Sequence, residues 1–304
     1  MSFVTVTGLT KSYGAVRAVD DFSFEVKQGE IYALVGPDGA GKTTIIRTLC
    51  NLVRSDKGSA FIDGLDVSRQ FEAIKSRLGY MPQTFSLYPD LSVEENLRFY
   101  GGIHGVVGKR FRDKTEVLYG FSNLKPFASR RAGKLSGGMK QKLALSCALI
   151  YDPKLLLLDE PTTGVDPLSR QQFWKILLDL KRQGVTIIVS TPYMDEVARA
   201  DRACFVFEGR KLVEDRSETL SDRFDGRLYF LDMAPSVKLV DGLNDLPGID
   251  ARRFGSGLHL YLAREDAIEN YSAMLTALGV DTTDVKEIRP NLEDCFIQFM
   301  EQTS

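Results

Sequence analysis

Residues 36–44 combine glycines, a lysine and hydroxyl groups at the spacing of a phosphate-binding loop. The stretch reads Gly36-Pro37-Asp38-Gly39-Ala40-Gly41-Lys42-Thr43-Thr44 and matches the pattern G-x-x-x-x-G-K-[ST]. Gly39 and Gly41 allow backbone angles that turn successive N–H groups toward an anion. Lys42 would reach the β- and γ-phosphates, and the Thr43 hydroxyl would ligate Mg²⁺. The loop by itself leaves kinases, GTPases and ATPases open, with a plain glycine-rich turn as the alternative.

A second group of chemically active residues is the pair Asp159 and Glu160, which directly follows the apolar run 155–158. A buried strand that ends in two acids would deliver both carboxylates to the carboxyl edge of a parallel sheet, where such folds bind ligands. Asp159 would bind Mg²⁺ directly or through water. Glu160 would polarise the attacking water as a general base. The alternative is a solvated strand end whose acids only aid solubility.

Hydrophobic patterning predicts the elements that position these residues. Apolar runs at 31–35, 155–158 and 185–190 predict buried strands. Their alternation with helical patterns predicts an α/β fold, a phosphate-loop NTPase core with a mostly parallel sheet. Between about 84 and 151 the pattern becomes mostly helical, and a capping box at Ser92 opens one helix. We expect this segment to form a helical lobe inserted into the core.

A joint near residues 217–225 predicts two domains, 1–216 and 217–304, in keeping with the length of 304 residues. Beyond the joint, the pattern predicts two strands and one helix, at 227–232, 258–262 and 265–278. We therefore expect the second domain to be a small α/β appendage.

The stretch Leu135-Ser136-Gly137-Gly138-Met139-Lys140-Gln141 resembles the signature sequence of ATP-binding cassette (ABC) proteins. The resemblance extends over about residues 3–215, because the family's motifs follow one another in the family's order. It implies that ATP and Mg²⁺ are the cofactors, and that two subunits hold two ATP molecules between them, head to tail. In that arrangement Ser136, Gly137 and Gly138 serve the γ-phosphate of ATP held by the opposite subunit.

Other positions carry over from the family one at a time. Tyr13 resembles the aromatic residue that stacks on adenine, with a core tyrosine as the alternative. Gln83 resembles the catalytic glutamine that contacts Mg²⁺ and links the site to the helical lobe. Asp166 matches the residue that communicates across the dimer. Asp38 stands where the family usually has asparagine, and the loop should tolerate it because both residues form turns.

One functional position departs from the family. After the strand that ends at Ser190, the family usually reads Ser-Thr-His, whereas this chain reads Ser190-Thr191-Pro192. Proline has neither a side-chain donor nor a backbone N–H, so it does not replace histidine chemically. Either Glu160 suffices and Pro192 is neutral, or the site binds ATP and hydrolyses it slowly. We favour impaired hydrolysis.

Two further stretches resemble exporter ATPases of the ABC-2 type, namely residues 84–97 and the C-terminal Leu292-Glu293-Asp294-Cys295-Phe296. The phosphate loop is most similar to that of multidrug or cation efflux systems. The resemblance implies an ATP-hydrolysing subunit that powers efflux through separate multi-span permease subunits. Aromatic residues within 85–88 would contact the permease, or they would only pack the helical lobe.

Composition excludes several other classes. Lys plus Arg is 39 and Asp plus Glu is 41, a net charge of −2, which argues against a nucleic-acid partner. No apolar run approaches the roughly 18 residues of a membrane span, and residues 1–7 do not resemble a signal peptide. The scattered cysteines predict buried, reduced thiols, and His259 is predicted on a solvent-facing strand position. We expect a cytoplasmic protein that is peripheral on the inner face of the membrane through its permease.

Three readings of function stay open at this point. The leading one is the exporter ATPase, as a homodimer or a heterodimer. The second is a hydrolysis-impaired clamp that forms the regulatory half of an asymmetric ABC pair. The third is a soluble ABC protein of translation or DNA repair, which is weakened because 304 residues hold neither two cassettes nor long coiled-coil insertions.

Overall fold

The predicted buried strands form the centre of a computed structural model that describes residues 2–302. They are β3 (Ile31–Val35), β7 (Leu155–Asp159) and β8 (Thr186–Thr191), and every residue of the three is buried. The other strands of this sheet are β6 (Leu78–Met81), β9 (Arg202–Phe207) and β10 (Arg210–Arg216). The strand order is β10-β9-β3-β8-β7-β6, and all neighbours are parallel except β10 and β9. The predicted α/β core with a mostly parallel sheet is confirmed.

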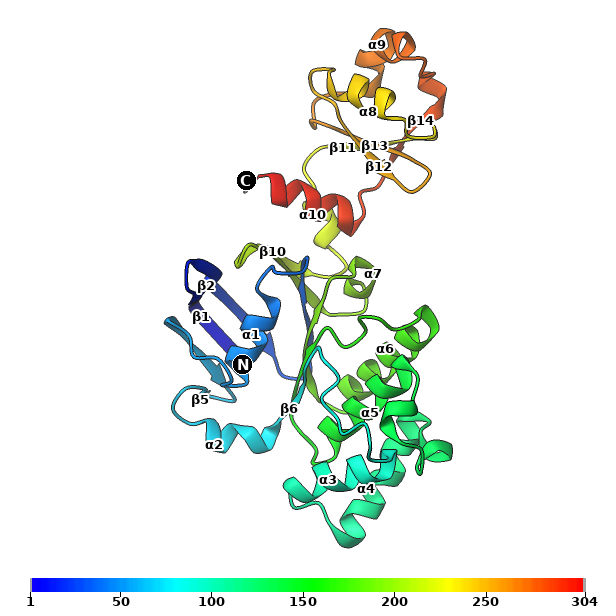
Figure 1. Ribbon diagram of the computed structural model, residues 1–304. Helices are drawn as coiled ribbons and strands as arrows, with labels where there is room; N and C mark the ends of the chain where they lie inside the picture. The colour runs from blue at the N-terminus through cyan, green and yellow to red at the C-terminus, as the bar shows by residue number, and fades with distance from the viewer. Residues whose placement is uncertain (1, 303–304) are drawn as a thin grey trace. The chain divides into compact units, whose positions relative to one another are not determined.

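A second, antiparallel sheet was not foreseen from the sequence. Its strands are β1 (Ser2–Tyr13), β2 (Val16–Lys27), β4 (Lys57–Ile62) and β5 (Leu65–Asp66), in the order β2-β1-β4-β5. Along most of β1, β2 and β4 the buried residues are separated by exposed or half-buried ones, so these strands lack the continuous apolar runs that identify parallel strands. Helix α1 (Lys42–Leu49) shares one apolar core with both sheets (Figure 1), in which Phe24 stacks on Tyr32 with ring centroids 5.2 Å apart.

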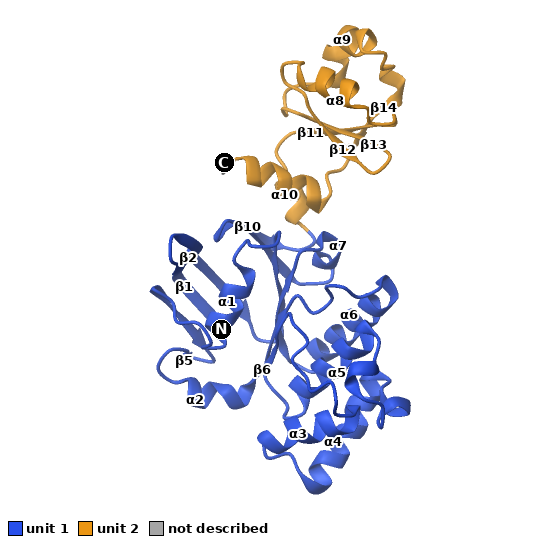
Figure 2. Ribbon diagram, in the orientation of Figure 1, with its two compact units in different colours: residues 1–218 blue, residues 219–304 orange. Residues whose placement is uncertain are grey.

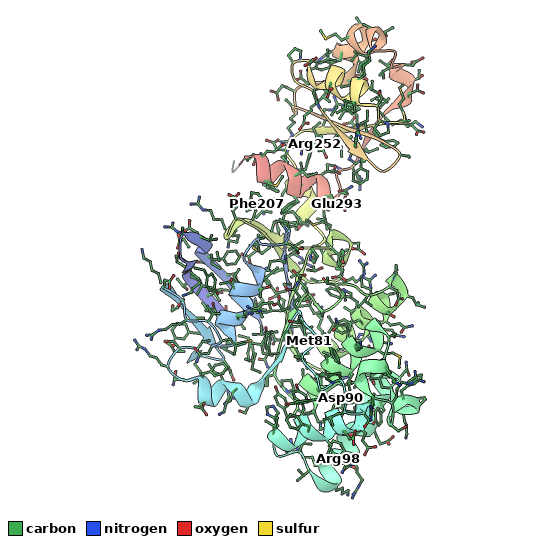
Figure 3. All side chains as sticks on the ribbon, in the orientation of Figure 1. Met81, Asp90, Arg98, Phe207, Arg252 and Glu293 are labelled. Carbon is green, nitrogen blue, oxygen red and sulfur yellow. The ribbon has the colours of Figure 1, made fainter. Side chains whose placement is uncertain are left out.

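The segment between β6 and β7 is largely helical, as predicted. Its elements are α3 (Val93–Ile103), α4 (Gly108–Ser122), η2 (Lys125–Phe127), η3 (Ala132–Lys134) and α5 (Gly137–Leu149). The predicted capping box is present, because the Ser92 hydroxyl accepts from the Glu95 N–H at 3.2 Å and Glu95 Oε2 accepts from the Ser92 N–H at 2.7 Å. Figure 3 labels Met81, at the end of β6, and Arg98, on α3.

The remaining helices of the first unit connect its strands. They are α2 (Phe71–Ile74), η1 (Lys75–Arg77), α6 (Pro167–Arg182) and α7 (Met194–Val197). Asp166 caps α6, and Pro167 stands at the first helical position, where its missing N–H costs no helical bond. The chain forms two compact units that divide between Glu218 and Thr219 (Figure 2).

The second unit is an antiparallel sheet with its own core. Its elements are η4 (Leu220–Arg223), β11 (Arg227–Leu231), α8 (Val237–Asn244), β12 (Asp250–Phe254), β13 (Gly257–Leu262), η5 (Ile268–Tyr271), α9 (Ser272–Ala277), η6 (Thr282–Asp284), β14 (Val285–Ile288) and α10 (Leu292–Glu301). The strand order is β12-β13-β11-β14, and all neighbours are antiparallel. This chain order and strand order make a split β-α-β arrangement of the ferredoxin-like type, followed by α10. Arg252 on β12 and Glu293 near the start of α10 are labelled in Figure 3.

The predicted solvent-facing position of His259 is wrong. The side chain is 3 % exposed, its Nδ1 lies 2.7 Å from Asp294 Oδ1, and the Phe254 ring stacks on it with centroids 3.9 Å apart. Alternate residues of β13, such as Leu258 and Leu260, enter the core on the side of α8 and α9. The opposite face is covered as well, because Asp294 belongs to α10. The alternating pattern did not reveal that both faces of this strand are covered.

The four cysteines, Cys50, Cys147, Cys204 and Cys295, are buried and form no disulfide, as predicted. Within residues 2–302 no helix has both the length and the apolar character that crossing a bilayer requires.

Candidate active site

The phosphate loop joins β3 to α1 and needs glycine at particular positions. Gly39 and Gly41 have φ angles of +81° and +105°, which residues other than glycine rarely adopt. A Cβ on Gly36 would lie 2.1 Å from the Val206 carbonyl oxygen, and one on Gly41 would lie 2.3 Å from that of Ala18. The loop therefore requires glycine for two reasons: the positive φ angles of its turn and the close approach of neighbouring carbonyl groups. Three other predicted residues of the loop and of the first turn of α1 differ in exposure: Asp38 is exposed, Ala40 is buried and Thr44 is half-buried.

The ammonium group of Lys42 lies inside this loop. Its Nζ donates to the carbonyl oxygens of Gly36 at 2.8 Å and Pro37 at 2.9 Å, and it lies 3.2 Å from Glu160 Oε1. Both charged side chains are buried, with exposures of 3 % and 4 %. The pair neutralises two charges that would otherwise be costly to bury. A phosphate bound in the loop would compete with Glu160 for the lysine.

Asp159 ends β7, and among the described residues only one of its two carboxylate oxygens accepts hydrogen bonds. Its Oδ1 accepts from the Thr43 hydroxyl at 3.0 Å and from the Ser190 hydroxyl at 2.8 Å. Its Oδ2 is buried and has no hydrogen-bond partner among the described residues. Burial raises the pKa of Asp159 above its ordinary value, although the two hydroxyl bonds oppose that shift. An unsatisfied carboxylate oxygen beside the Thr43 hydroxyl is a donor set that fits a hard divalent cation such as Mg²⁺.

Glu160 follows in a conformation unusual for its type. Its φ is +48°, a backbone region that persists only where surrounding contacts impose it. Here its N–H donates to the Ser190 hydroxyl at 2.9 Å, and its Oε2 accepts from Gln83 Nε2 at 2.9 Å and from the Thr163 hydroxyl at 3.2 Å. The structure thus brings Gln83 and Glu160 together with Lys42, at the carboxyl edge of the central sheet.

Ser190 is a site residue that the sequence analysis missed. Its hydroxyl donates to Asp159 and accepts from the Glu160 backbone, so one group orients both acids. The register pairs Asp159 with Ser190 on neighbouring strands. The available signal was a pair of hydroxyl residues, Ser190 and Thr191, at the end of an otherwise apolar run.

The predicted signature residues lie on the helical lobe. Ser136 caps α5, where its hydroxyl accepts from the Met139 N–H at 3.4 Å, and Gly137 and Gly138 begin the helix. In the described part of the chain no hydrogen bond links these three residues to the phosphate loop. Asp166 caps α6 by accepting from the Ser169 N–H at 2.9 Å, and that bond lowers the pKa of its carboxyl group. These groups stand outside the cluster around Lys42.

Tyr13, at the end of β1, is 48 % exposed. That exposure excludes the alternative of a core tyrosine. The Lys11 ammonium lies 5.5 Å from the centre of its ring, and the exposed ring face is of the kind on which a nucleobase stacks.

The segment with Pro192 follows β8 directly. The Tyr193 N–H donates to the Thr191 hydroxyl at 3.1 Å, and that hydroxyl donates to Glu196 Oε2 at 2.6 Å. Neither His104 nor His259 replaces the missing histidine, because His104 follows α3 and stacks on Tyr151, and His259 is buried against Asp294 within its own unit. Neither histidine of the chain therefore takes the position that Pro192 occupies.

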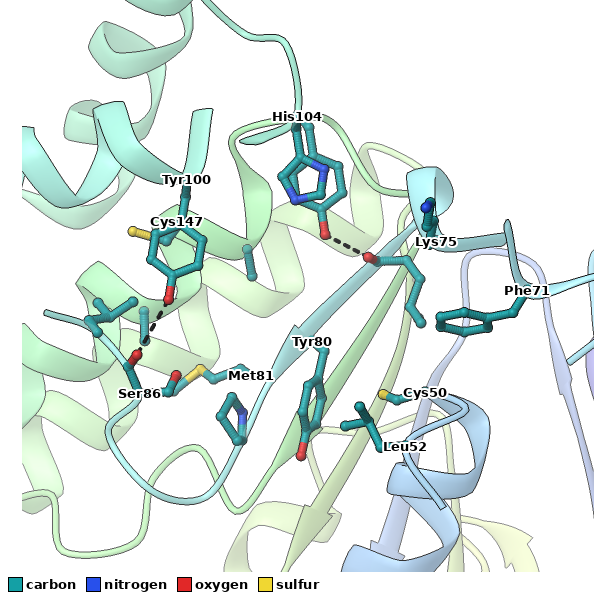
Figure 4. Close-up of a pocket in the computed structure, with 16 residues that line it drawn as sticks. Cys50, Leu52, Phe71, Lys75, Tyr80, Met81, Ser86, Tyr100, His104 and Cys147 are labelled. Carbon is teal, nitrogen blue, oxygen red and sulfur yellow. Dashed lines mark hydrogen bonds between the residues drawn. The ribbon is translucent and has the colours of Figure 1, made fainter. Parts of the chain in front are cut away.

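A cavity of about 300 Å³ lies between the core and the helical lobe (Figure 4). Tyr80 and Met81 of β6 line one side of it, and Tyr100 and His104 of α3 line the other. The Tyr100 hydroxyl donates to the Ser86 carbonyl oxygen at 3.3 Å. The cavity is mostly apolar and adjoins the segment that leads to Gln83.

Comparisons with known proteins identify the family. The family model described as ABC transporter matches residues 19–163. The chain is 38 % identical over 303 residues to the probable multidrug ABC transporter ATP-binding protein YbhF of Escherichia coli, covering 98 % of this chain and 52 % of YbhF. It thus spans about half the length of that relative. It is 39 % identical over 303 residues to the Nod factor export ATP-binding protein I of Sinorhizobium fredii, covering 97 % of this chain and 85 % of that protein.

A third relative is the daunorubicin resistance ATP-binding protein DrrA3 of Streptomyces coeruleorubidus, 32 % identical over 304 residues, with 97 % of this chain and 94 % of that protein covered. Among solved structures, an ATP-binding subunit of an ABC transporter matches with a TM-score of 0.66 at 28 % identity, covering 73 % of this chain and 93 % of that one. The motifs, their geometry and the extent of these matches agree: the chain belongs to the ABC transporter family of ATP-binding proteins.

Proposed function

We propose that this chain binds ATP with Mg²⁺ and hydrolyses it to ADP and phosphate, as the ATP-binding subunit of an ABC-2 type exporter. The observation that carries the proposal is the buried group formed by Lys42, Asp159 and Glu160 beside the phosphate loop. The printed names of the relatives concern multidrug transport, Nod factor export and daunorubicin resistance. Their similarity supports the exporter role.

The contacts support a role for each residue in hydrolysis. The loop N–H groups and Lys42 bind the phosphates, which draws the ammonium away from Glu160. Glu160, oriented by Gln83 and Thr163, then accepts a proton from the water that attacks the γ-phosphate. Mg²⁺, held by Thr43, Asp159 and Gln83, would neutralise charge on the phosphate oxygens. Tyr13 would stack on the adenine ring.

We infer that a second ATP-binding subunit completes the site. The signature residues Ser136, Gly137 and Gly138 form a helix N-terminus, which favours an anion. They share no hydrogen bond with the phosphate loop of the same chain within the described residues, which agrees with their serving a nucleotide held by another subunit. Asp166, exposed at the start of α6, would lie in the same interface.

We also infer that the cavity of Figure 4 and its rim receive a segment of a multi-span permease. The rim carries exposed apolar side chains on or near α3: Tyr88 at 46 %, Phe99 at 40 % and Ile103 at 62 %. Leu87, by contrast, is buried and lines the cavity itself. This docking would hold the chain on the inner face of the membrane.

Steady-state hydrolysis by the purified protein tests the proposal. We expect Mg²⁺-dependent release of phosphate from ATP that Glu160→Gln abolishes while ATP binding persists, because the loop and Lys42 remain intact. Lys42→Ala should weaken ATP binding itself. Hydrolysis that continues unchanged in Glu160→Gln would contradict the assignment of the general base.

Pro192 favours a second candidate, a slowly hydrolysing clamp. We predict that Pro192→His raises kcat at least tenfold, because one added charge-stabilising contact in a comparable site changes rates by about 10²–10³. Pro192→Ala is the control, since it removes the proline ring and adds no imidazole. If neither variant changes kcat, Pro192 does not limit the rate and the ordinary exporter ATPase stands.

A further inference from the structure

Glu196 is a buried carboxylate that the proposed mechanism does not use. It belongs to α7 and is 1 % exposed. Its Oε1 accepts from the Thr162 hydroxyl at 2.7 Å, and its Oε2 accepts from the Thr191 hydroxyl at 2.6 Å. Both threonines are buried as well. A carboxylate is retained in such a place only when hydrogen bonds compensate for its lost hydration, and here each oxygen has one.

The two threonines belong to the two segments that shape the acid site. Thr162 comes two residues after Glu160, in the turn that follows β7. Thr191 ends β8, next to Ser190, whose hydroxyl holds both Asp159 and Glu160. Glu196 therefore connects the turn after the general base Glu160 to the end of β8, where Ser190 orients Glu160. That bridge supports the positive φ of Glu160, which needs imposed contacts.

Arg170 of α6 lies beside this bridge. Its Nε is 4.0 Å from Glu196 Oε1, and its guanidinium lies 4.2 Å from the centre of the Tyr193 ring. Arg170 stands one turn after Asp166, the residue that caps α6. The start of α6 and the segment around Pro192 thus meet at Glu196.

The contacts around Pro192 show what holds this segment in place of a histidine. The Thr191 hydroxyl accepts from the Tyr193 N–H and donates to Glu196. Thr191 and Tyr193 flank Pro192 in the chain. Hydrogen bonds therefore hold the residues before and after Pro192, although proline itself has no N–H to donate.

We propose that Glu196 is a positioning residue for ATP hydrolysis, which ties the Thr162 turn to the end of β8 and so holds Glu160 in its reactive orientation. This inference rests on the proposed ATPase function. It assigns Glu196 no contact with nucleotide, so substrate binding and turnover should respond differently to its removal.

Steady-state kinetics and ATP binding test this role with three variants. Glu196→Leu removes both bonds and keeps the volume, and it should lower kcat at least tenfold while KM and the Kd for ATP stay within twofold. Glu196→Gln keeps a bond to each threonine, through its amide oxygen and its NH₂ group, and should retain kcat within threefold. Asp195→Asn, on the same helix, is the matched control: it loses only the ion pair of a 66 % exposed carboxylate with Arg170, at 3.5 Å. Because such surface pairs contribute little, this variant should keep kcat, KM and the Kd for ATP within twofold.

Thr162→Val supplies a milder variant should Glu196→Leu not fold, because it deletes one hydroxyl at nearly constant volume. It should lower kcat without changing the Kd for ATP. Unchanged kcat in Glu196→Leu or in Thr162→Val overturns the positioning role, and so does a loss in Glu196→Gln as large as that in Glu196→Leu. An unaltered protein without Mg²⁺-dependent hydrolysis overturns the proposed function together with this inference.

Discussion

Asp159 illustrates how burial governs a single carboxylate in this site. Its native pKa is raised above the roughly 3.9 of an unfolded chain, because burial disfavours its charge more than the Ser190 and Thr43 hydroxyls favour it. Between those two pKa values the native state binds more protons than the unfolded state. The stability of the nucleotide-free protein therefore falls as the pH rises through that window, and the loss persists at neutral pH.

We predict that Asp159→Asn separates stability from activity. Without the buried charge, the melting temperature of the nucleotide-free protein at neutral pH should equal or exceed that of the unaltered protein. Its fall as the pH rises above the ordinary pKa of an aspartate should diminish. Hydrolysis should fall by about 10² or more, because the substitution removes the charge of the carboxylate that we propose as a ligand of Mg²⁺. Thermal melts across pH and phosphate-release assays measure the two effects. A lower melting temperature together with retained Mg²⁺-dependent hydrolysis would refute the assignment.

At the scale of elements, the start of α5 is set by its packing on α6. A Cβ on Gly138 would lie 2.5 Å from the Cβ and Oγ of Ser169, whereas a Cβ on Gly137 would meet only the Gly164 carbonyl oxygen, at 3.5 Å. Alanine is otherwise favoured over glycine in a helix by about 1 kcal/mol. The neighbouring glycines of the signature therefore have different structural requirements.

We predict that Gly138→Ala lowers the free energy of unfolding by about 1–3 kcal/mol, the usual cost of overpacking. Gly137→Ala should leave it unchanged or raise it slightly, since its Cβ meets only ordinary contact. Denaturant titration of both variants provides the comparison, and equal effects would contradict this account of the packing.

The attachment of α10 within the second unit is also an element-scale feature. Asp294 is fully buried, and it accepts from the Tyr261 hydroxyl at 2.7 Å and from the Asn291 N–H at 2.9 Å, besides contacting His259. Burial, and then the bond to Asp294, raise the pKa of Tyr261. One side chain thus caps the helix and holds it against the sheet.

We predict that Asp294→Ala destabilises the second unit by about 1–3 kcal/mol for each buried partner that it leaves without a hydrogen bond. Glu293→Ala, at the exposed neighbouring position, should cost less than about 0.5 kcal/mol. Unfolding followed by calorimetry measures both variants, and similar losses in the two would show that the buried contacts of Asp294 do not stabilise α10.

At the scale of the whole molecule, each unit has an apolar core of its own, one spanning the two sheets of residues 1–218 and one within residues 219–304. The candidate nucleotide residues all belong to the first unit. A ligand stabilises only the cooperative unit that binds it. ATP should therefore act on one part of the unfolding curve.

We predict two unfolding transitions in calorimetry. A saturating nucleotide at 100 times its Kd should stabilise one of them by about 2.7 kcal/mol and leave the other unchanged. Asp294→Ala should lower the transition that the nucleotide does not move. A single transition, or equal shifts in both, would show that the units unfold together.

Three of the parallel strands and the site motifs were predictable because each is encoded locally. Continuous apolar runs identified β3, β7 and β8, and the phosphate loop and the paired acids are short segments whose residue types state their chemistry. The antiparallel strands β1 and β2 were not predicted, because a sheet with one buried face gives no continuous apolar run in the sequence. His259 was misplaced for a related reason, since the helix that covers it lies 35 residues further along the chain.

The sequence alone determined the family, the α/β class, the phosphate-loop chemistry and the absence of a histidine at position 192, because all of these reside in contiguous segments. Only the tertiary structure decided that the Ser190 hydroxyl orients both acids, that Glu196 bridges Thr162 and Thr191, and that Asp159 keeps one oxygen unsatisfied. The contacts of Ser190 with both acids, and that of Glu196 with Thr162, join residues 30 to 34 positions apart in the chain. Such residues become neighbours when parallel strands align at one edge of a sheet. No local pattern specifies that alignment, so it emerges only when the chain is folded.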